Sequence, residues 1–141
     1  MQDRYLFRAK RLDNGEWVQG ALLDGENHCL IGQEIKFSPY LEHECKIVGY
    51  EVDRDTICQC TGLKDKNGKL IWENDIVAYW DTYSTENGQA EADCVGKVVW
   101  DDETISFQVT NRLSAESWEV LDECSVIGNA IDNPELLESE D

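Results

Sequence analysis

Residues 58–80 read CQCTGLKDKNGKLIWENDIVAYW, and this stretch decides the fold. Asn67-Gly68 lies between two strand-like runs, 58–63 and 70–72, and Asn-Gly favours a tight hairpin turn because both residues accept positive φ. After the turn, residues 76–80 are apolar on both faces of a strand, which is typical of a central strand. The stretch therefore predicts a strand, a tight turn and two further strands.

The same strand and turn signals recur on both sides of this stretch. Asp13-Asn14-Gly15 separates residues 5–9 from residues 17–22, which predicts a second hairpin. Residues 104–110 alternate apolar and polar side chains, as expected of a half-buried strand. Residues 94–100 are rich in Val, and Gly96 within them predicts a bulge or bend.

Other segments predict less regular structure. Residues 81–93 are polar and rich in small side chains, so we expect a long loop there. Asn133 as N-cap and Pro134 as the first helical position predict a helix of one or two turns near the end. The sequence therefore predicts an all-β fold of mostly antiparallel short strands with a short C-terminal helical turn.

The order of the predicted elements indicates two parts. Residues 1–54 form an expected N-terminal β subdomain, with the boundary near 52–56. Residues 55–137 form an expected second subdomain whose strand order resembles an SH3-like barrel. Residues 138–141 are expected to be a frayed acidic tail.

The composition excludes some classes of function. The 141 residues are 41% hydrophobic, which is enough for a core, and they include 12 Lys and Arg against 30 Asp and Glu, a net charge of −18. We expect no direct nucleic acid binding, because phosphate contacts need a cationic surface. Residues 101–141 hold one basic and twelve acidic residues, a net charge of −11, and this field attracts a basic partner.

The distribution of apolar residues and cysteines bears on location. The longest unbroken apolar run is residues 76–80, far shorter than the roughly 20 residues that span a bilayer. The start of the chain is basic but lacks the apolar segment of a secretory signal. We therefore expect a cytoplasmic protein, without membrane contact and with its six cysteines reduced.

Three stretches together resemble the YopX family of bacteriophage and prophage proteins. They are residues 7–20, residues 59–77 with TGLKDKNG and a following Glu-x-Asp-Ile-Val, and residues 126–137 with VIGN and NPELL. The resemblance implies a small, phage-encoded, mainly β protein and assigns no catalytic residue. The family usually has Gly where this chain has Asn74, and Asn also accepts positive φ.

The residues of these motifs have no assigned chemistry, and roles in forming turns and starting strands explain them. Lys64, Lys66 and Lys69 surround the Asn67-Gly68 turn, where they and the nearby carboxylates would form a local charge cluster. The motif residues of interest are Thr61, Gly62, Leu63, Lys64, Asp65, Lys66, Asn67, Gly68, Glu73, Asp75, Gly128, Asn129 and Pro134.

Two sets of residues are candidates for metal chemistry. His43, Cys45, Cys58 and Cys60 are zinc-ligating types, but each pair has one residue between its members, whereas structural zinc sites favour C-x₂₋₄-C. Residues 53–55 and 101–103 offer carboxylates for a divalent metal, although 101–103 also fits a turn between strands. The sequence therefore predicts no metal site and no cofactor.

These observations favour a non-catalytic module that binds a host or phage protein. One alternative is an acidic decoy that occupies a host nucleic-acid-binding protein electrostatically. Another is a metal-dependent enzyme that uses the carboxylates above. We also expect a homo-oligomer that associates through a strand edge or an apolar face and not through residues 101–103 or 116–123, where like charges would meet.

Overall fold

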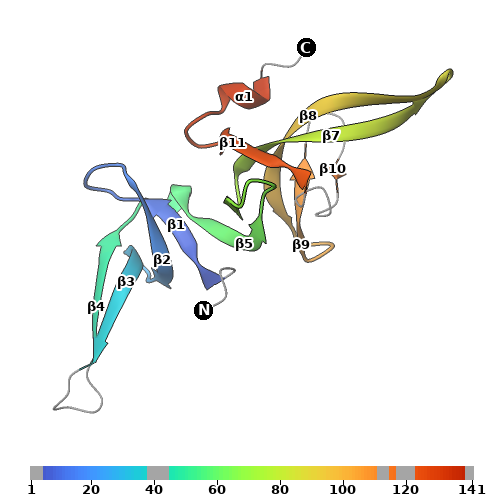
Figure 1. Ribbon diagram of the computed structural model, residues 1–141. Helices are drawn as coiled ribbons and strands as arrows, with labels where there is room; N and C mark the ends of the chain where they lie inside the picture. Colours follow the sequence, from blue (N-terminus) through green and yellow to red (C-terminus); the bar gives the residue numbers. More distant parts are fainter. Residues whose placement is uncertain (1–4, 38–44, 111–114, 117–122, 139–141) are drawn as a thin grey trace. The chain divides into compact units, whose positions relative to one another are not determined.

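The computed structural model describes residues 5–37, 45–110, 115–116 and 123–138 (Figure 1). The chain divides into two compact units, Met1–Cys60 and Thr61–Asp141. Antiparallel strands dominate both, so the all-β prediction is confirmed. In the described part of the chain, no helix is long and apolar enough to cross a membrane.

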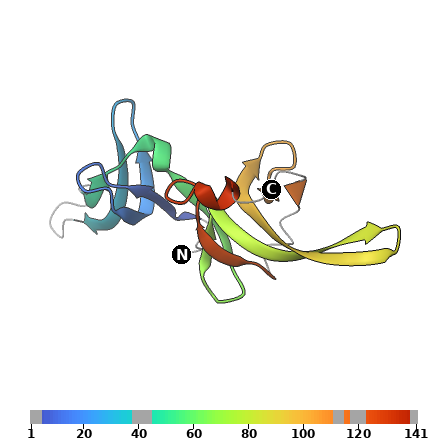
Figure 2. The same cartoon turned by 90° about the horizontal axis from the view of Figure 1, so that it is seen from above.

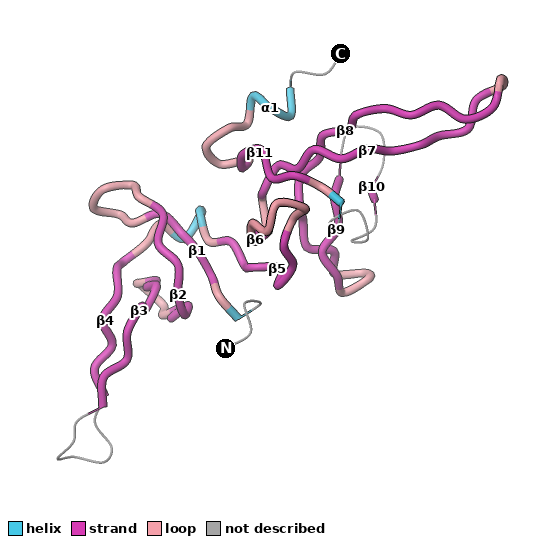
Figure 3. Tube along the Cα trace, viewed as in Figure 1, coloured by secondary structure: helices cyan, strands magenta, loops and turns pink. Residues whose placement is uncertain are grey.

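The first unit contains most of a six-stranded antiparallel sheet with the strand order β4-β3-β2-β1-β5-β6, of which β6 belongs to the second unit. Ala9, Cys29, Ile31 and Val52 form its buried core. The elements are β1 (Phe7–Lys10), β2 (Trp17–Asp24), β3 (Cys29–Phe37), β4 (Cys45–Glu51), the 3₁₀ helix η2 (Arg54–Thr56) and β5 (Cys58–Lys64), which ends in the second unit (Figure 3).

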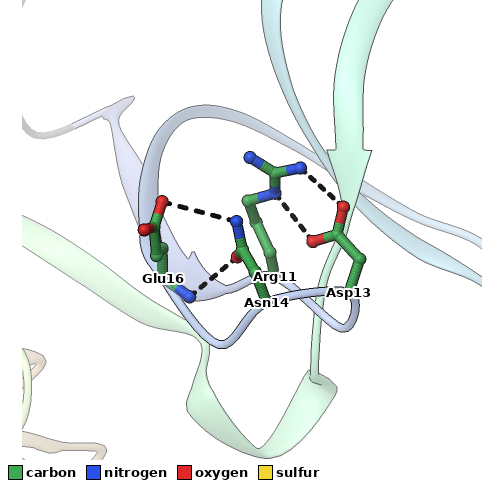
Figure 4. Close-up of polar contacts among 4 residues, drawn as sticks. All are labelled: Arg11, Asp13, Asn14 and Glu16. Atoms are coloured by element: carbon green, nitrogen blue, oxygen red, sulfur yellow. Dashed lines mark hydrogen bonds and ion pairs between the residues drawn. The ribbon is translucent and has the colours of Figure 1, made fainter.

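The predicted hairpin at Asp13-Asn14-Gly15 is confirmed, because β1 pairs with β2 and Gly15 has a φ of 72°. Figure 4 shows how the turn is held: Arg11 Nε donates to Asp13 at 2.9 Å, and the backbone N–H of Glu16 donates to Asn14 Oδ1 at 3.0 Å. The hydrogen bond from Arg11 lowers the pKa of Asp13. Arg11 also stacks over the ring of Tyr50, 3.9 Å from its centroid.

The second unit is a five-stranded sheet with the order β10-β9-β8-β7-β11, preceded by β6. Its elements are β6 (Leu70–Trp72), β7 (Asp75–Thr85), β8 (Gly88–Asp101), β9 (Ser106–Thr110), β10 (Ala115–Glu116), β11 (Ser125–Asn129) and α1 (Glu135–Glu138). The predicted central strand at 76–80 is confirmed within β7, and the predicted helical turn is confirmed as α1. Figure 2 shows the long β7–β8 hairpin from above.

The SH3-like barrel is not confirmed. Among the described strands β10 and β11 lie at opposite edges of the sheet, so the sheet is open. Its core face carries Val77, Tyr79, Val98 and Val109, with Ile71 and Cys124 packed against them.

The prediction of a long loop at residues 81–93 is wrong, because these residues belong to the β7–β8 hairpin. The register of β7 with β8 runs without interruption from Ile76↔Lys97 to Thr85↔Gly88, and Gly88 has a φ of 121°. Backbone hydrogen bonds hold this hairpin together, and they need no alternation of apolar side chains. The Thr and Tyr residues in 81–85 also have high strand propensity, which the polar composition of the segment obscures.

The strand predicted at 104–110 begins later than expected. β9 starts at Ser106, whereas Ile105 lies in a turn with a φ of 54° and is 74% exposed. The left-handed conformation costs a residue other than Gly about 1–2 kcal/mol. The side chain of Asp101 holds this turn by accepting from Glu103 N and Thr104 Oγ1, each at 3.0 Å, which accounts for the delayed strand.

Gly96 forms no bulge in the β7–β8 pairing, because the register is continuous through it. It has a packing role instead. A Cβ at Gly96 would lie 2.5 Å from Val109 Cγ1 and 2.8 Å from the carbonyl oxygen of Thr110. The missing side chain lets Val109 fill the core at this point.

We therefore expect Gly96→Ala to lower the free energy of unfolding by about 1–3 kcal/mol, the usual cost of overpacking. Val95→Ala, at the half-buried neighbouring position, is the matched control. Urea denaturation followed by tryptophan fluorescence measures both. A Gly96→Ala protein as stable as the wild type would contradict the packing role.

Candidate functional site

One hydrogen-bonded contact, which we call the joint, links the β5–β6 turn to β11 through Asp65, Asn67, Lys69 and Val126. Asp65 lies at its centre and is 6% exposed. Its Oδ1 accepts from the backbone N–H groups of Asn67 and Lys69, and its Oδ2 accepts from that of Val126, each at 2.9 Å. One carboxylate therefore both closes the β5–β6 turn and fastens it to β11, 61 residues further along the chain.

The local sequence explains the turn. The N–H of Asp65 donates to Lys69 O at 2.8 Å, and that of Gly68 donates to Asp65 O at 3.0 Å. Gly68 has a φ of 83°, which Gly adopts without steric cost. The predicted Asn67-Gly68 turn is thus confirmed. A further bond from Lys66 N to Cys124 O, at 3.0 Å, ties the turn to the chain just before β11.

Burial alone would raise the pKa of Asp65, because it penalises the charged form. The backbone hydrogen bonds from Val126, Lys69 and Asn67, helped by the positive charge of Lys69, outweigh that effect and lower the pKa. Asp65 is therefore held as a carboxylate and serves as an acceptor of hydrogen bonds.

A second contact joins the motifs at Asn74. Its φ is 71°, in agreement with the expectation that Asn accepts a positive φ at this position. Its N–H donates to Val98 O and its carbonyl accepts from Ala130 N, both at 2.8 Å. The neighbouring Asp75 is 1% exposed, and its Oδ2 accepts from Trp72 N at 2.8 Å. The turn from β6 into β7 is thereby held against β8 and against the residue that follows β11.

The closing motif builds the loop between β11 and α1. Asn129 Oδ1 accepts from the N–H groups of Ile131 at 3.1 Å and Asp132 at 2.8 Å. Asn133 Oδ1 accepts from Asn129 N at 3.2 Å, so this side chain turns back to β11 instead of capping the helix as predicted. A Cβ at Gly128 would lie 2.7 Å from Asn133 Oδ1, which explains the glycine. The carbonyl of Pro134 accepts from Leu137 N at 3.1 Å.

The remaining motif residues lie in β5 and in the turns on either side of β6. Thr61 Oγ1 donates to Ile71 O at 2.8 Å and accepts from Leu63 N at 3.1 Å, and Gly62 between them has a φ of 83°. Leu63 packs on the core. The structure places Lys64, Lys66 and Lys69 on the exposed tip, and Glu73 is half-buried.

The candidate metal ligands are not brought together in the described structure. Cys58 and Cys60 are fully buried, and Cys58 Sγ donates to Thr56 O at 3.3 Å. His43 and the side chain of Cys45 lie outside the described residues. Among the described residues, no group of three or more His, Cys, Asp or Glu is arranged to hold a metal ion. Cys29, Cys58, Cys60, Cys94 and Cys124 are not joined in disulfide bonds.

Structural hydrogen bonds engage two of the carboxylates considered for a divalent metal, Asp53 and Asp101. Asp53 Oδ1 accepts from Asp55 N at 3.0 Å and caps η2. Asp101 holds the β8–β9 turn, as predicted for residues 101–103.

Sequence reasoning placed Asp65 in a turn but missed its bond to Val126. An Asp two residues before Asn-Gly is a signal for an Asx turn, which accounts for the bond to Asn67 N. The bond to Val126 has no local signal, since its partner is set by the fold of the sheet.

The structure is that of a small all-β protein. Its motif residues form turns and link strands by hydrogen bonds. The chain belongs to the YopX family, because the YopX protein family model matches residues 6–138. The chain is also similar to the crystal structure of protein EF1440 from Enterococcus faecalis. The identity is 30%, the similarity covers 93% of this chain and 96% of that one, and the TM-score is 0.61. No curated protein matches the chain.

Asp65→Asn tests the joint. The amide group of Asn would place a donor beside backbone donors, so we expect the free energy of unfolding to fall by about 1–3 kcal/mol. Glu26→Gln removes the same charge from an exposed loop and should change stability by less than about 0.5 kcal/mol. Urea denaturation at neutral pH compares the three proteins, and equal stability of wild type and Asp65→Asn would refute the role of Asp65.

The lowered pKa of Asp65 also sets a pH dependence. Its folded-state pKa lies below the ordinary value of 3.8, so its contribution to stability is fully present above that value. The contribution is lost as the pH falls below about 3.8 and through the folded-state pKa. The stability difference between wild type and Asp65→Asn should therefore shrink on acidification, as urea denaturation at a series of pH values would show. A difference that grows in acid would contradict this account.

Proposed function

We propose that this protein is a non-catalytic protein-binding module of phage or prophage origin that acts in the cytoplasm of a bacterial host. The observation that carries the proposal is that the carboxylates of the motifs have structural roles. Asp65 and Asp75 are buried and accept hydrogen bonds from backbone N–H groups. These groups stabilise turns and strand starts, so the motifs support a framework that presents a surface.

The exposed side chains of the second unit support a protein partner. Among the described side chains of this unit, four large apolar residues are exposed: Trp80, Trp100, Ile105 and Ile127. Trp is enriched among the residues that dominate protein–protein binding energy. The net charge of −18 would steer a basic partner toward this surface and repel a nucleic acid.

A second copy of the chain is a further proposed partner. Antiparallel sheets leave edge strands with unpaired backbone groups, and such edges pair readily with another chain. The contact would use a strand edge or an apolar face and would leave out the acidic residues 101–103 and 116–123, because like charges would repel there.

The acidic decoy is the second candidate, favoured by the net charge of −11 over residues 101–141. Salt separates the two functions, because screening weakens a purely electrostatic complex far more than one with an apolar interface.

The test is a pull-down from a bacterial host lysate with the tagged full chain, at low and at high salt. Resin coated with polyglutamate is the control for charge alone. We expect a specific partner that stays bound at high salt and binds the purified protein with fixed stoichiometry in calorimetry. A partner shared with polyglutamate and lost at high salt would indicate the decoy, and the absence of any specific partner would contradict both functions.

A further inference from the structure

We propose that the β8–β9 turn, residues 100–106, is the docking element of this protein, and that it inserts into an apolar pocket bordered by Lys or Arg on a partner protein. This inference rests on the proposed function and adds to it the contact surface and the chemistry of the partner.

Ile105 is the first observation. It is 74% exposed, the largest exposed fraction among the large hydrophobic side chains of the described structure, and its φ is 54°. A β-branched residue is unfavourable in this conformation, which suits Gly or Asn. Neither core packing nor backbone geometry therefore explains the isoleucine. A residue in an unfavourable backbone conformation at an exposed position is a sign of function.

The turn that carries Ile105 is held in place by its own side chains. Asp101 binds Glu103 N and Thr104 Oγ1, each at 3.0 Å. Thr104 Oγ1 also lies 2.8 Å from Ser106 Oγ and accepts from Gln108 Nε2 at 3.0 Å. The exposed isoleucine is thus presented on an ordered turn, and preorganisation lowers the entropy cost of binding.

Trp100 supplies a second apolar surface at the base of the same turn. It is 43% exposed, and its ring meets Phe107 edge to face, with centroids 5.1 Å apart at an angle of 72°. Its Nε1 donates to Asp102 Oδ1 at 2.8 Å. The indole is therefore fixed, with part of its surface left to a partner. Ordered aromatic and aliphatic residues of this kind are typical anchors of protein interfaces.

The charge around the turn selects the partner. Asp102 and Glu103 are exposed beside Ile105. Carboxylates bordering an apolar anchor match Lys or Arg around a pocket and speed the encounter. The same carboxylates and the net charge of −18 disfavour a second copy at this turn, because like charges would face each other. The partner is therefore a different, basic protein.

A library of 12-residue peptides displayed on phage is the probe, selected against the purified full chain. We expect enriched peptides that combine Lys or Arg with Leu, Ile, Phe or Trp. Ile105→Gly removes the apolar side chain and suits the positive φ, so it should weaken peptide binding about tenfold or more while the protein stays folded. Glu103→Lys should weaken binding to a similar degree. Leu12→Ala alters an exposed apolar residue of the other unit and should leave binding unchanged.

Three results would overturn the inference. The library could yield no enrichment of basic and apolar peptides, or Ile105→Gly could bind the selected peptides as well as the wild type does. Light scattering could also show that Ile105→Gly lowers the molar mass, which would mean that the turn contacts a second copy of the chain. Repeating the lysate pull-down with Ile105→Gly separates this inference from the proposed function. A partner captured equally by wild type and variant would keep the protein-binding function and refute this docking site, whereas no partner for the wild type would refute the function itself.

Discussion

The carboxylate of Asp65 is the constraint on which the second unit depends. It is buried, and burial of a charged group is unfavourable unless hydrogen bonds compensate for the lost water. Three backbone N–H groups supply that compensation, two from its own turn and one from Val126 in β11. Because β11 is an edge strand, a row of its N–H groups faces away from β7, and Asp65 satisfies one of them. A single side chain thus orders a turn and covers part of a sheet edge.

Hydrogen bonds link two of the three stretches that resemble the YopX family. Residues 59–77 supply Asp65 and Asn74, and residues 126–137 supply their partners Val126 and Ala130. Residues far apart in the sequence therefore keep one another in place. The β8–β9 turn lies outside these stretches and carries an exposed isoleucine with a positive φ. We interpret the motifs as a shared scaffold and this turn as an element that meets a partner.

Local chemistry made part of this structure predictable from sequence. The Asn-Gly turns, the central strand at 76–80 and the short helix at Glu135–Glu138 follow from residue types and short-range periodicity. The polar sequence of residues 81–93 predicts a loop, whereas the structure has a hairpin there. Backbone hydrogen bonds hold such a hairpin without an apolar pattern. The alternation of apolar and polar residues predicts a strand that includes Ile105. In the structure, the hydrogen bonds accepted by Asp101 hold a turn that includes Ile105. The partner of Asp65 depends on a contact across 61 residues, which no local pattern contains.

Amide hydrogen exchange at Val126, followed by NMR in the intact protein, tests the joint most directly. If Asp65 accepts this N–H in solution, the amide should exchange much more slowly than an exposed one, with protection comparable to that of the amides paired between β7 and β11. In Asp65→Asn the protection at Val126 should be lost first. An amide of Val126 that exchanges in the wild type as fast as an unprotected one would contradict the account.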